Sequence, residues 1–203
     1  MISIPRPRAL LLDLDNTLVD RDAAFAAWVA SVVPPEAVAT IVALDAGGYG
    51  DKPALYRAVA RAAGLDLVDA RESFHTSFPS FFRLRADADG LLAAFSGLTV
   101  IVTNGARRLQ RAKIAHAGLE GRVDHVVVSA ELAVEKPDPA IFLAALARAG
   151  CAPDEALMVG DHPVNDIAGA QAVGIPAVFV RSPWFADPVG VAAVTLLSEI
   201  TWS

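Results

Sequence analysis

The sequence predicts an α/β fold in which a doubly wound parallel sheet carries an inserted α-helical domain. From Ala86 to Val180, short apolar runs alternate with helical patterns, and this alternation is typical of β-α-β crossovers in a parallel sheet. Residues 21–83 show only helical periodicity, punctuated by Gly and Pro. We therefore expect a core domain formed by residues 1–20 and 84–203, and a helical domain formed by residues 21–83.

The composition indicates a globular protein with a substantial core. The 203 residues are 54% hydrophobic and 20% charged, and the formal net charge is −6. This charge disfavours a polyanionic partner such as nucleic acid. No apolar run is long enough to span a bilayer, and the first one ends too early for a signal peptide. The lone Cys151 excludes an internal disulfide. We expect a cytoplasmic protein, without nucleic-acid or membrane partners, that is a monomer or weak homodimer.

The first element is a buried strand that begins at Ala9 and ends in Asp13-Leu14-Asp15. A short, continuous apolar run is typical of a strand covered on both faces. Residues two apart on an extended chain point the same way, so the two carboxylates can converge on one ligand. Because they repel each other, such a pair favours a metal site or a proton-transfer site. The alternative is an ordinary polar turn after a strand.

The helical segment is divided by proline and glycine. Asp22 is a candidate N-cap for a first helix that ends at Pro34, and residues 45–50 form a loop. A second helix is expected to begin at Pro35. A third is expected to begin at Asp51 or Lys52 and to stop at Gly64, and a fourth to run from about Val68 to Phe78.

The remainder predicts alternating helices and strands before a less regular tail. The expected helices are Ala88–Phe95, Arg107–Ala117, Pro139–Ala149 and Asn165–Val173. The expected strands are Leu98–Val102, Val123–Val128, Ala156–Val159 and Ala177–Val180.

Polar residues at the strand ends are the candidate site, because ligands of open parallel sheets bind beyond the carboxyl ends of the strands. Besides the first strand, these residues are Thr103-Asn104-Gly105, the segment from Glu131 to Lys136, and Gly160-Asp161-His162.

Each of these groups of residues can be interpreted as part of a functional site or as an ordinary structural feature. Thr103-Asn104-Gly105 at a helix start suits an oxyanion, or is a turn with an N-cap. Lys136 can neutralise clustered carboxylates, or is a solvated charge. Asp161 and Asp166 are hard oxygen ligands suited to Mg²⁺, and Asp166 is equally suited to the first turn of a helix.

Together these residues resemble the four motifs of the haloacid dehalogenase-like hydrolase superfamily, in the correct order. The matching stretches are Asp13-Leu-Asp-Asn-Thr-Leu18, Thr103 in Val-Thr-Asn-Gly, Lys136 in Glu-Lys-Pro, and Gly160-Asp-His-Pro-Val-Asn-Asp166. The resemblance covers the chain from Leu10 to Val180 and implies a Rossmann-like core. The insertion is similar to the small helical cap of the family.

The resemblance implies Mg²⁺-dependent hydrolysis of a small phosphorylated metabolite, a sugar phosphate or a nucleoside monophosphate, through an aspartyl-phosphate. Asp13 would be the nucleophile, and Asp15 would protonate the leaving oxygen and then activate water. Lys136 would steady the nucleophile and the phosphate.

The other implied roles concern the metal and the phosphoryl group. Asp13, the backbone carbonyl of Asp15 and Asp161 would hold Mg²⁺, and Asp166 would lie in its outer shell or bond to Lys136. The substrate-binding residues would be Thr103, Asn104 and Gly105. Residues of the cap would select the substrate, and the candidates are Arg21, Tyr49, Lys52, His75 and Arg83.

Three alternatives remain open to different degrees. A metal-independent 2-haloacid dehalogenase lacks the second carboxylate of the first motif, so Asp15 argues against that activity. A phosphomutase of the same family retains Asp15 and is compatible with the sequence. The presence of every motif residue argues against a non-catalytic binding protein.

Overall fold

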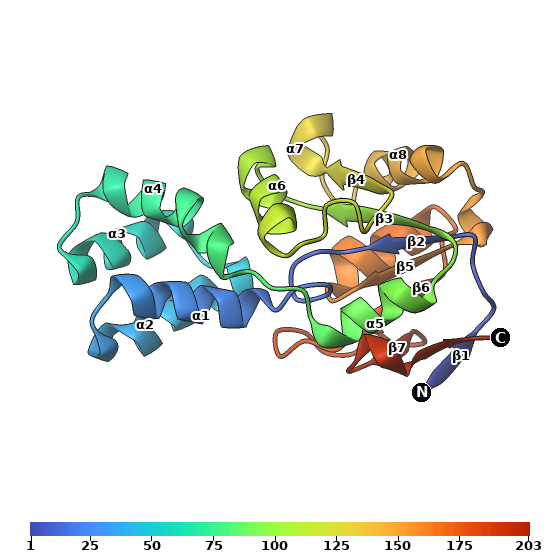
Figure 1. Ribbon diagram of the computed structural model, residues 1–203, viewed down its shortest axis with the longest axis horizontal. Coiled ribbons are helices and arrows are strands. Elements are labelled where there is room, and N and C mark those ends of the chain that lie inside the picture. Colours follow the sequence, from blue (N-terminus) through green and yellow to red (C-terminus); the bar gives the residue numbers. More distant parts are fainter.

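The computed structural model describes residues 1–203 and confirms the α/β fold (Figure 1). A six-stranded sheet has the order β4-β3-β2-β5-β6-β7, and every neighbouring pair is parallel. The strands are β2 (Ala9–Leu12), β3 (Leu98–Thr103), β4 (His125–Val128), β5 (Ala156–Gly160), β6 (Ala177–Val180) and β7 (Ala192–Val194).

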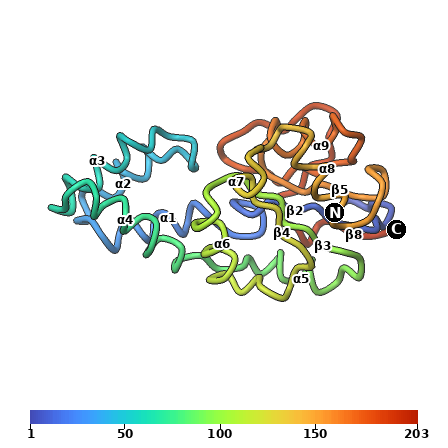
Figure 2. The backbone as a smooth tube through the Cα atoms, turned by 90° about the horizontal axis from the view of Figure 1, so that it is seen from above, coloured from blue at the N-terminus to red at the C-terminus, as the bar shows by residue number.

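The central strand β2 is buried on both faces, which explains its continuous apolar sequence. Leu10 and Leu12 pack in one cluster with residues of α5 (Ala86–Ala94) and α6 (Arg107–His116). Ala9 and Leu11 pack on the opposite face, in a cluster with residues of α8 (Pro139–Ala149) and α9 (Gly169–Ala172). Figure 2 shows these helices as two layers with the sheet between them.

Four helices follow β2 and form a helical unit beyond the end of the sheet (Figure 1). They are α1 (Arg21–Val32), α2 (Pro35–Asp45), α3 (Lys52–Ala63) and α4 (Leu67–Thr76), with 3₁₀ turns at Ala46–Gly48 and Phe78–Phe81. The interior is aromatic: the Trp28 ring lies 5.4 Å from that of Phe74 and 5.8 Å from that of Phe78. The prediction of four helices in this stretch is confirmed.

The two connections between the helical unit and the sheet lie side by side. Val19 forms an isolated bridge with Leu84, and the Arg85 amide donates to the Leu18 carbonyl at 3.0 Å. The unit is therefore attached to the sheet through one paired, two-stranded neck.

The expected N-cap of α1 was wrong. Asp20 caps this helix by accepting a hydrogen bond from the Ala23 amide at 2.9 Å. Asp22 lies within the first turn, where its carboxylate accepts instead from the Trp184 indole at 2.6 Å. In addition, Asp45 ends α2 and does not belong to the following loop.

Other differences lie in short elements. The expected helix Asn165–Val173 is a π-helical segment, Pro163–Ala168, followed by α9. The strand expected from Val123 begins at His125 and leads into α7 (Ser129–Leu132). In the tail, β8 (Ile200–Trp202) pairs with β1 (Ile2–Ile4) beside the two chain termini (Figure 1). No helix has both the length and the apolar character needed to cross a membrane.

Candidate active site

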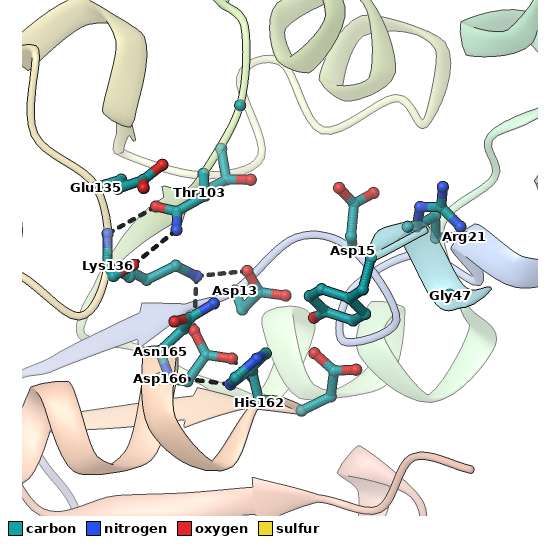
Figure 3. A pocket seen from close by; sticks show the side chains of 15 residues that line it. Asp13, Asp15, Arg21, Gly47, Thr103, Glu135, Lys136, His162, Asn165 and Asp166 are labelled. Atoms are coloured by element: carbon teal, nitrogen blue, oxygen red, sulfur yellow. Dashed lines mark hydrogen bonds and ion pairs between the residues drawn. The ribbon is translucent and has the colours of Figure 1, made fainter. Parts of the chain in front are cut away.

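The predicted strand-end residues meet around one cavity of about 280 Å³ (Figure 3). It opens where β2, β3 and β5 end, and the loop after α2 borders it from the helical unit. The lining residues are Asp13, Asp15, Arg21, Gly47, Gly48, Tyr49, Thr103, Asn104, Gly105, Glu135, Lys136, Asp161, His162, Asn165 and Asp166. The eight residues expected from the sequence to be catalytic, phosphate-binding or metal-binding are all among them.

Lys136 is the centre of a buried charge network (Figure 3). Its ammonium donates to Asp13 Oδ1 and to Asp166 Oδ1, each at 2.6 Å, and to the Val102 carbonyl at 2.8 Å. Burial disfavours the charged ammonium, but the two carboxylates outweigh burial and raise the pKa of Lys136. The lysine is therefore held charged, with all three of its hydrogens directed to acceptors.

Three buried carboxylates lie near the single ammonium of Lys136. Asp13, Asp161 and Asp166 each offer an oxygen within 4.8 Å of the others. Burial, together with the neighbouring carboxylates, raises the pKa of Asp13 to about 7 and that of Asp161 to about 9. Asp161 Oδ2 is buried without a hydrogen-bond partner. Hard oxygen donors with excess negative charge and an unpartnered oxygen fit a divalent cation such as Mg²⁺.

Asp166 has both carboxylate oxygens occupied. Oδ1 accepts from Lys136, and Oδ2 accepts from the His162 amide at 2.9 Å. A Cβ at position 160 would lie 2.4 Å from the Asp166 carboxylate, so only glycine allows this approach. Asp166 is thus built into the support of Lys136, which leaves the free oxygens of the cluster to Asp13 and Asp161.

The second motif contributes support as well as a hydroxyl. The Asn104 side chain donates to the Lys136 carbonyl at 2.9 Å and accepts from the Lys136 amide at 2.8 Å. The Gly105 amide donates to Ser129 Oγ at 2.9 Å. The Asn104 side chain therefore fixes the lysine backbone, while the buried Thr103 hydroxyl borders the cavity.

Asp15 has two partners that the sequence analysis missed. Its Oδ2 accepts from Lys113 Nζ at 2.6 Å and from Gln110 Nε2 at 3.3 Å. Burial alone would raise the pKa of Asp15, but the charges of Lys113 and Arg21 outweigh burial and hold it below its usual value. The only signal in the sequence was that both polar residues fall on the core-facing stripe of the helix, with Ile114.

Five residues of the helical unit were expected to select the substrate. Arg21 and Tyr49 line the cavity, whereas Lys52, His75 and Arg83 do not. Arg21 is buried and forms a bidentate ion pair with Asp45, with N–O distances of 2.5 and 2.9 Å. Gly47 and Gly48 also reach the cavity, where an added Cβ would meet Trp184 or Arg21.

The chain belongs to the haloacid dehalogenase-like hydrolase family, whose model matches residues 7–174. It resembles the solved structure of the HAD-hydrolase YfnB from Bacillus subtilis, which is bound to magnesium, with a TM-score of 0.79, 20% identity and coverage of 96% of each chain. This likeness shows the fold.

Two curated relatives match shorter regions. A phosphoserine phosphatase from Thermus thermophilus is 46% identical over 80 residues, which are 39% of this chain and 32% of the relative. A glyceraldehyde 3-phosphate phosphatase from Methanopyrus kandleri is 40% identical over 109 residues, or 54% of this chain and 43% of the relative. The chain thus matches less than half of the length of either relative.

Proposed function

We propose that this protein is a Mg²⁺-dependent phosphatase that hydrolyses a small phosphorylated metabolite through an aspartyl-phosphate. The observation that carries the proposal is the buried arrangement of Asp13 against Lys136, at 2.6 Å, beside Asp161 and its unpartnered oxygen. A carboxylate held next to a fixed cation, at the edge of a polar cavity, suits attack on phosphorus. The phosphatase names of both curated relatives support the same reaction class.

Asp13 is the proposed nucleophile, and Lys136 orients it. Lys136 donates to Asp13 Oδ1 and so fixes the orientation of the Asp13 carboxylate. The lysine also offers positive charge to the phosphoryl group as charge develops there. Thr103, through its hydroxyl, and the backbone amide of Asn104 are proposed to contact the phosphoryl oxygens, whereas the Gly105 amide already donates to Ser129 Oγ.

Asp15 is proposed to protonate the leaving oxygen and then to take a proton from the attacking water. The cation of Lys113 keeps this carboxylate ionised in the free protein. The negative charge of a bound phosphate ester acts in the opposite direction and favours the protonated carboxyl. Substrate binding thereby prepares Asp15 for its first proton transfer.

Mg²⁺ would be held by Asp13, Asp161 and the Asp15 carbonyl, and when bound it would offset the repulsion between carboxylate and phosphate. Asp166 is proposed to act through Lys136 and not as a direct ligand, since both of its oxygens have partners.

Residues 21–83 are proposed to form a cap over the cavity, hinged at the paired neck and attached to a core of residues 1–20 and 84–203. The cavity has a volume of about 280 Å³, and one of its fifteen lining residues is hydrophobic. This size and polarity suit a small sugar phosphate or hydroxy-acid phosphate better than a ligand with a large apolar group.

The proposal is tested with purified protein, 4-nitrophenyl phosphate and a panel of phosphorylated metabolites, with Mg²⁺ present or removed by EDTA. We expect Mg²⁺-dependent release of phosphate, and a loss of at least about 10³-fold in Asp13→Asn, because nucleophile and metal ligand are impaired together. If the wild-type protein turns over substrate no faster than Asp13→Asn, the proposed enzymatic activity is refuted. Isomerised sugar phosphate without free phosphate would instead identify a phosphomutase.

A further inference from the structure

Gln110 and Lys113 are polar residues on the buried face of α6. They lie one turn apart and are 1% and 3% exposed, beside the equally buried Ile114. A core-facing stripe normally carries apolar side chains, and burying an ammonium is costly unless it is paired. Packing alone therefore does not explain why these two polar residues are buried.

Both residues lead to the candidate catalytic groups. Lys113 donates to Asp15 Oδ2 at 2.6 Å. The Gln110 side-chain amide donates to Thr103 Oγ1 and to Asp15 Oδ2, with Nε2–O distances of 2.5 and 3.3 Å. One face of α6 thus contacts both Asp15, the proposed proton carrier after β2, and Thr103, the proposed phosphate-binding residue at the end of β3.

The pattern of bonds leaves specific atoms free. Asp15 Oδ2 is occupied from α6, whereas Oδ1 is buried and has no hydrogen-bond partner. Thr103 Oγ1 accepts from Gln110, so its own hydroxyl hydrogen is left to be donated. The Lys113 ammonium also lies 5.0 Å from the centre of the Phe82 ring.

We infer that Gln110 and Lys113 are positioning residues that hold Asp15 with Oδ1 free for proton transfer and Thr103 with its hydroxyl free for the phosphoryl group. This inference rests on the proposed function. In that reaction an oxygen of Asp13 bonds to phosphorus, the bond from phosphorus to the leaving oxygen breaks, and the proton of Asp15 passes to that oxygen. A displaced Asp15 slows this step most when the leaving oxygen is strongly basic.

The test compares kcat/KM for an alkyl phosphate and for 4-nitrophenyl phosphate, since kcat/KM reports the steps through release of the leaving group. The nitrophenolate ion leaves without protonation, whereas an alkoxide needs the proton. We expect Lys113→Met to reduce kcat/KM for the alkyl ester at least about tenfold more than for the aryl ester. Lys113→Arg should restore part of the difference.

Gln110→Leu provides a second variant that keeps every charge, and it should shift the ratio in the same direction. Arg108→Met is the matched control, because it removes an exposed cation from the same helix and should leave the ratio unchanged. Circular dichroism of each variant reports its folding.

Equal losses on both esters in folded Lys113→Met and Gln110→Leu would overturn the inference and assign both residues to packing. If the wild-type protein hydrolyses neither ester, the proposed function itself fails. The two failures are therefore distinguishable.

Discussion

At the scale of single residues, the position of Lys136 depends on the absence of a side chain at position 160. Asp166 can approach the end of β5 only because Gly160 has no Cβ, and a methyl group there would lie 2.4 Å from its carboxylate. Asp166 in turn holds Lys136, which holds Asp13. Gly160, which has no side chain, thus helps to determine how the proposed nucleophile Asp13 is oriented.

We predict that Gly160→Ala displaces Asp166 and reduces kcat with 4-nitrophenyl phosphate by about 10²-fold, since misplacing a catalytic group by about 1 Å has that effect. Gly90→Ala is the matched control. An added Cβ at position 90 meets nothing, and within α5 the alanine should stabilise the fold by up to about 1 kcal/mol. Unchanged kcat in Gly160→Ala would show that Asp166 does not support the site.

The residues that the sequence identified lie in the segments that follow strands, because the carboxyl ends of parallel strands share one edge. Asp13, Lys136 and Asp161 were found in this way. Gln110 and Lys113 were not, because they lie inside a helix whose rotation relative to β2 depends on packing. A polar residue in a core-facing stripe signals burial but does not identify its partner.

At the scale of elements, a buried ion pair joins α1 to the end of α2. Arg21 binds Asp45 through two hydrogen bonds, and Lys52 of α3 donates to the same carboxylate at 2.8 Å. Burial would raise the pKa of Asp45, but Arg21 and Lys52 outweigh burial and lower it below 3.8. The three helices therefore depend on one ionised carboxylate.

We predict that Asp45→Asn destabilises the protein by about 3 kcal/mol or more near neutral pH, because Arg21 loses its buried partner. A lowered pKa in the folded state contributes stability above the ordinary value of 3.8, and the contribution disappears as the pH falls through the folded-state pKa. The difference in unfolding free energy between wild type and variant should therefore shrink below about pH 4.

Urea unfolding at several pH values measures this difference. The matched control is Asp89→Asn, which removes an exposed partner of Arg122 and should change stability by less than about 1 kcal/mol at every pH. A difference for Asp45→Asn that is constant across pH would contradict the ion pair as its cause.

Elements were predictable in proportion to the strength of their local pattern. α8 and β6 have the bounds that their pattern indicates, because proline, glycine and a continuous apolar run mark them. β1, β7 and β8, each of three residues, are too short to show a period and form only through pairing with distant segments. The π-helical segment begins with a local cap, in which His162 Nδ1 accepts from the Val164 and Asn165 amides, and the sequence analysis did not anticipate this cap.

At the scale of the whole molecule, the cavity lies where the helical unit meets the sheet, and aromatic side chains join the two. The Trp184 indole rests against Gly47 and donates to Asp22 at 2.6 Å. The Tyr49 ring lies 5.3 Å from both the Phe185 and the His162 rings. These contacts hold the loop after α2 beside the strand ends, which is the arrangement expected if the proposed cap closes as a lid.

We predict that Trp184→Ala weakens closure and raises KM for 4-nitrophenyl phosphate by about three- to tenfold, because apparent affinity falls with the population of the closed form. Gly47→Ala should act in the same way, since its Cβ would lie 2.5 Å from the indole. Trp202→Ala removes an indole that packs on Phe95, 5.2 Å away between ring centres, and should leave KM unchanged. If all three variants keep the wild-type KM, the aromatic contact does not control access. If only Trp184→Ala and Gly47→Ala raise it, the cap closes through a contact with the loop after β6, and substrate selection depends on both parts of the molecule.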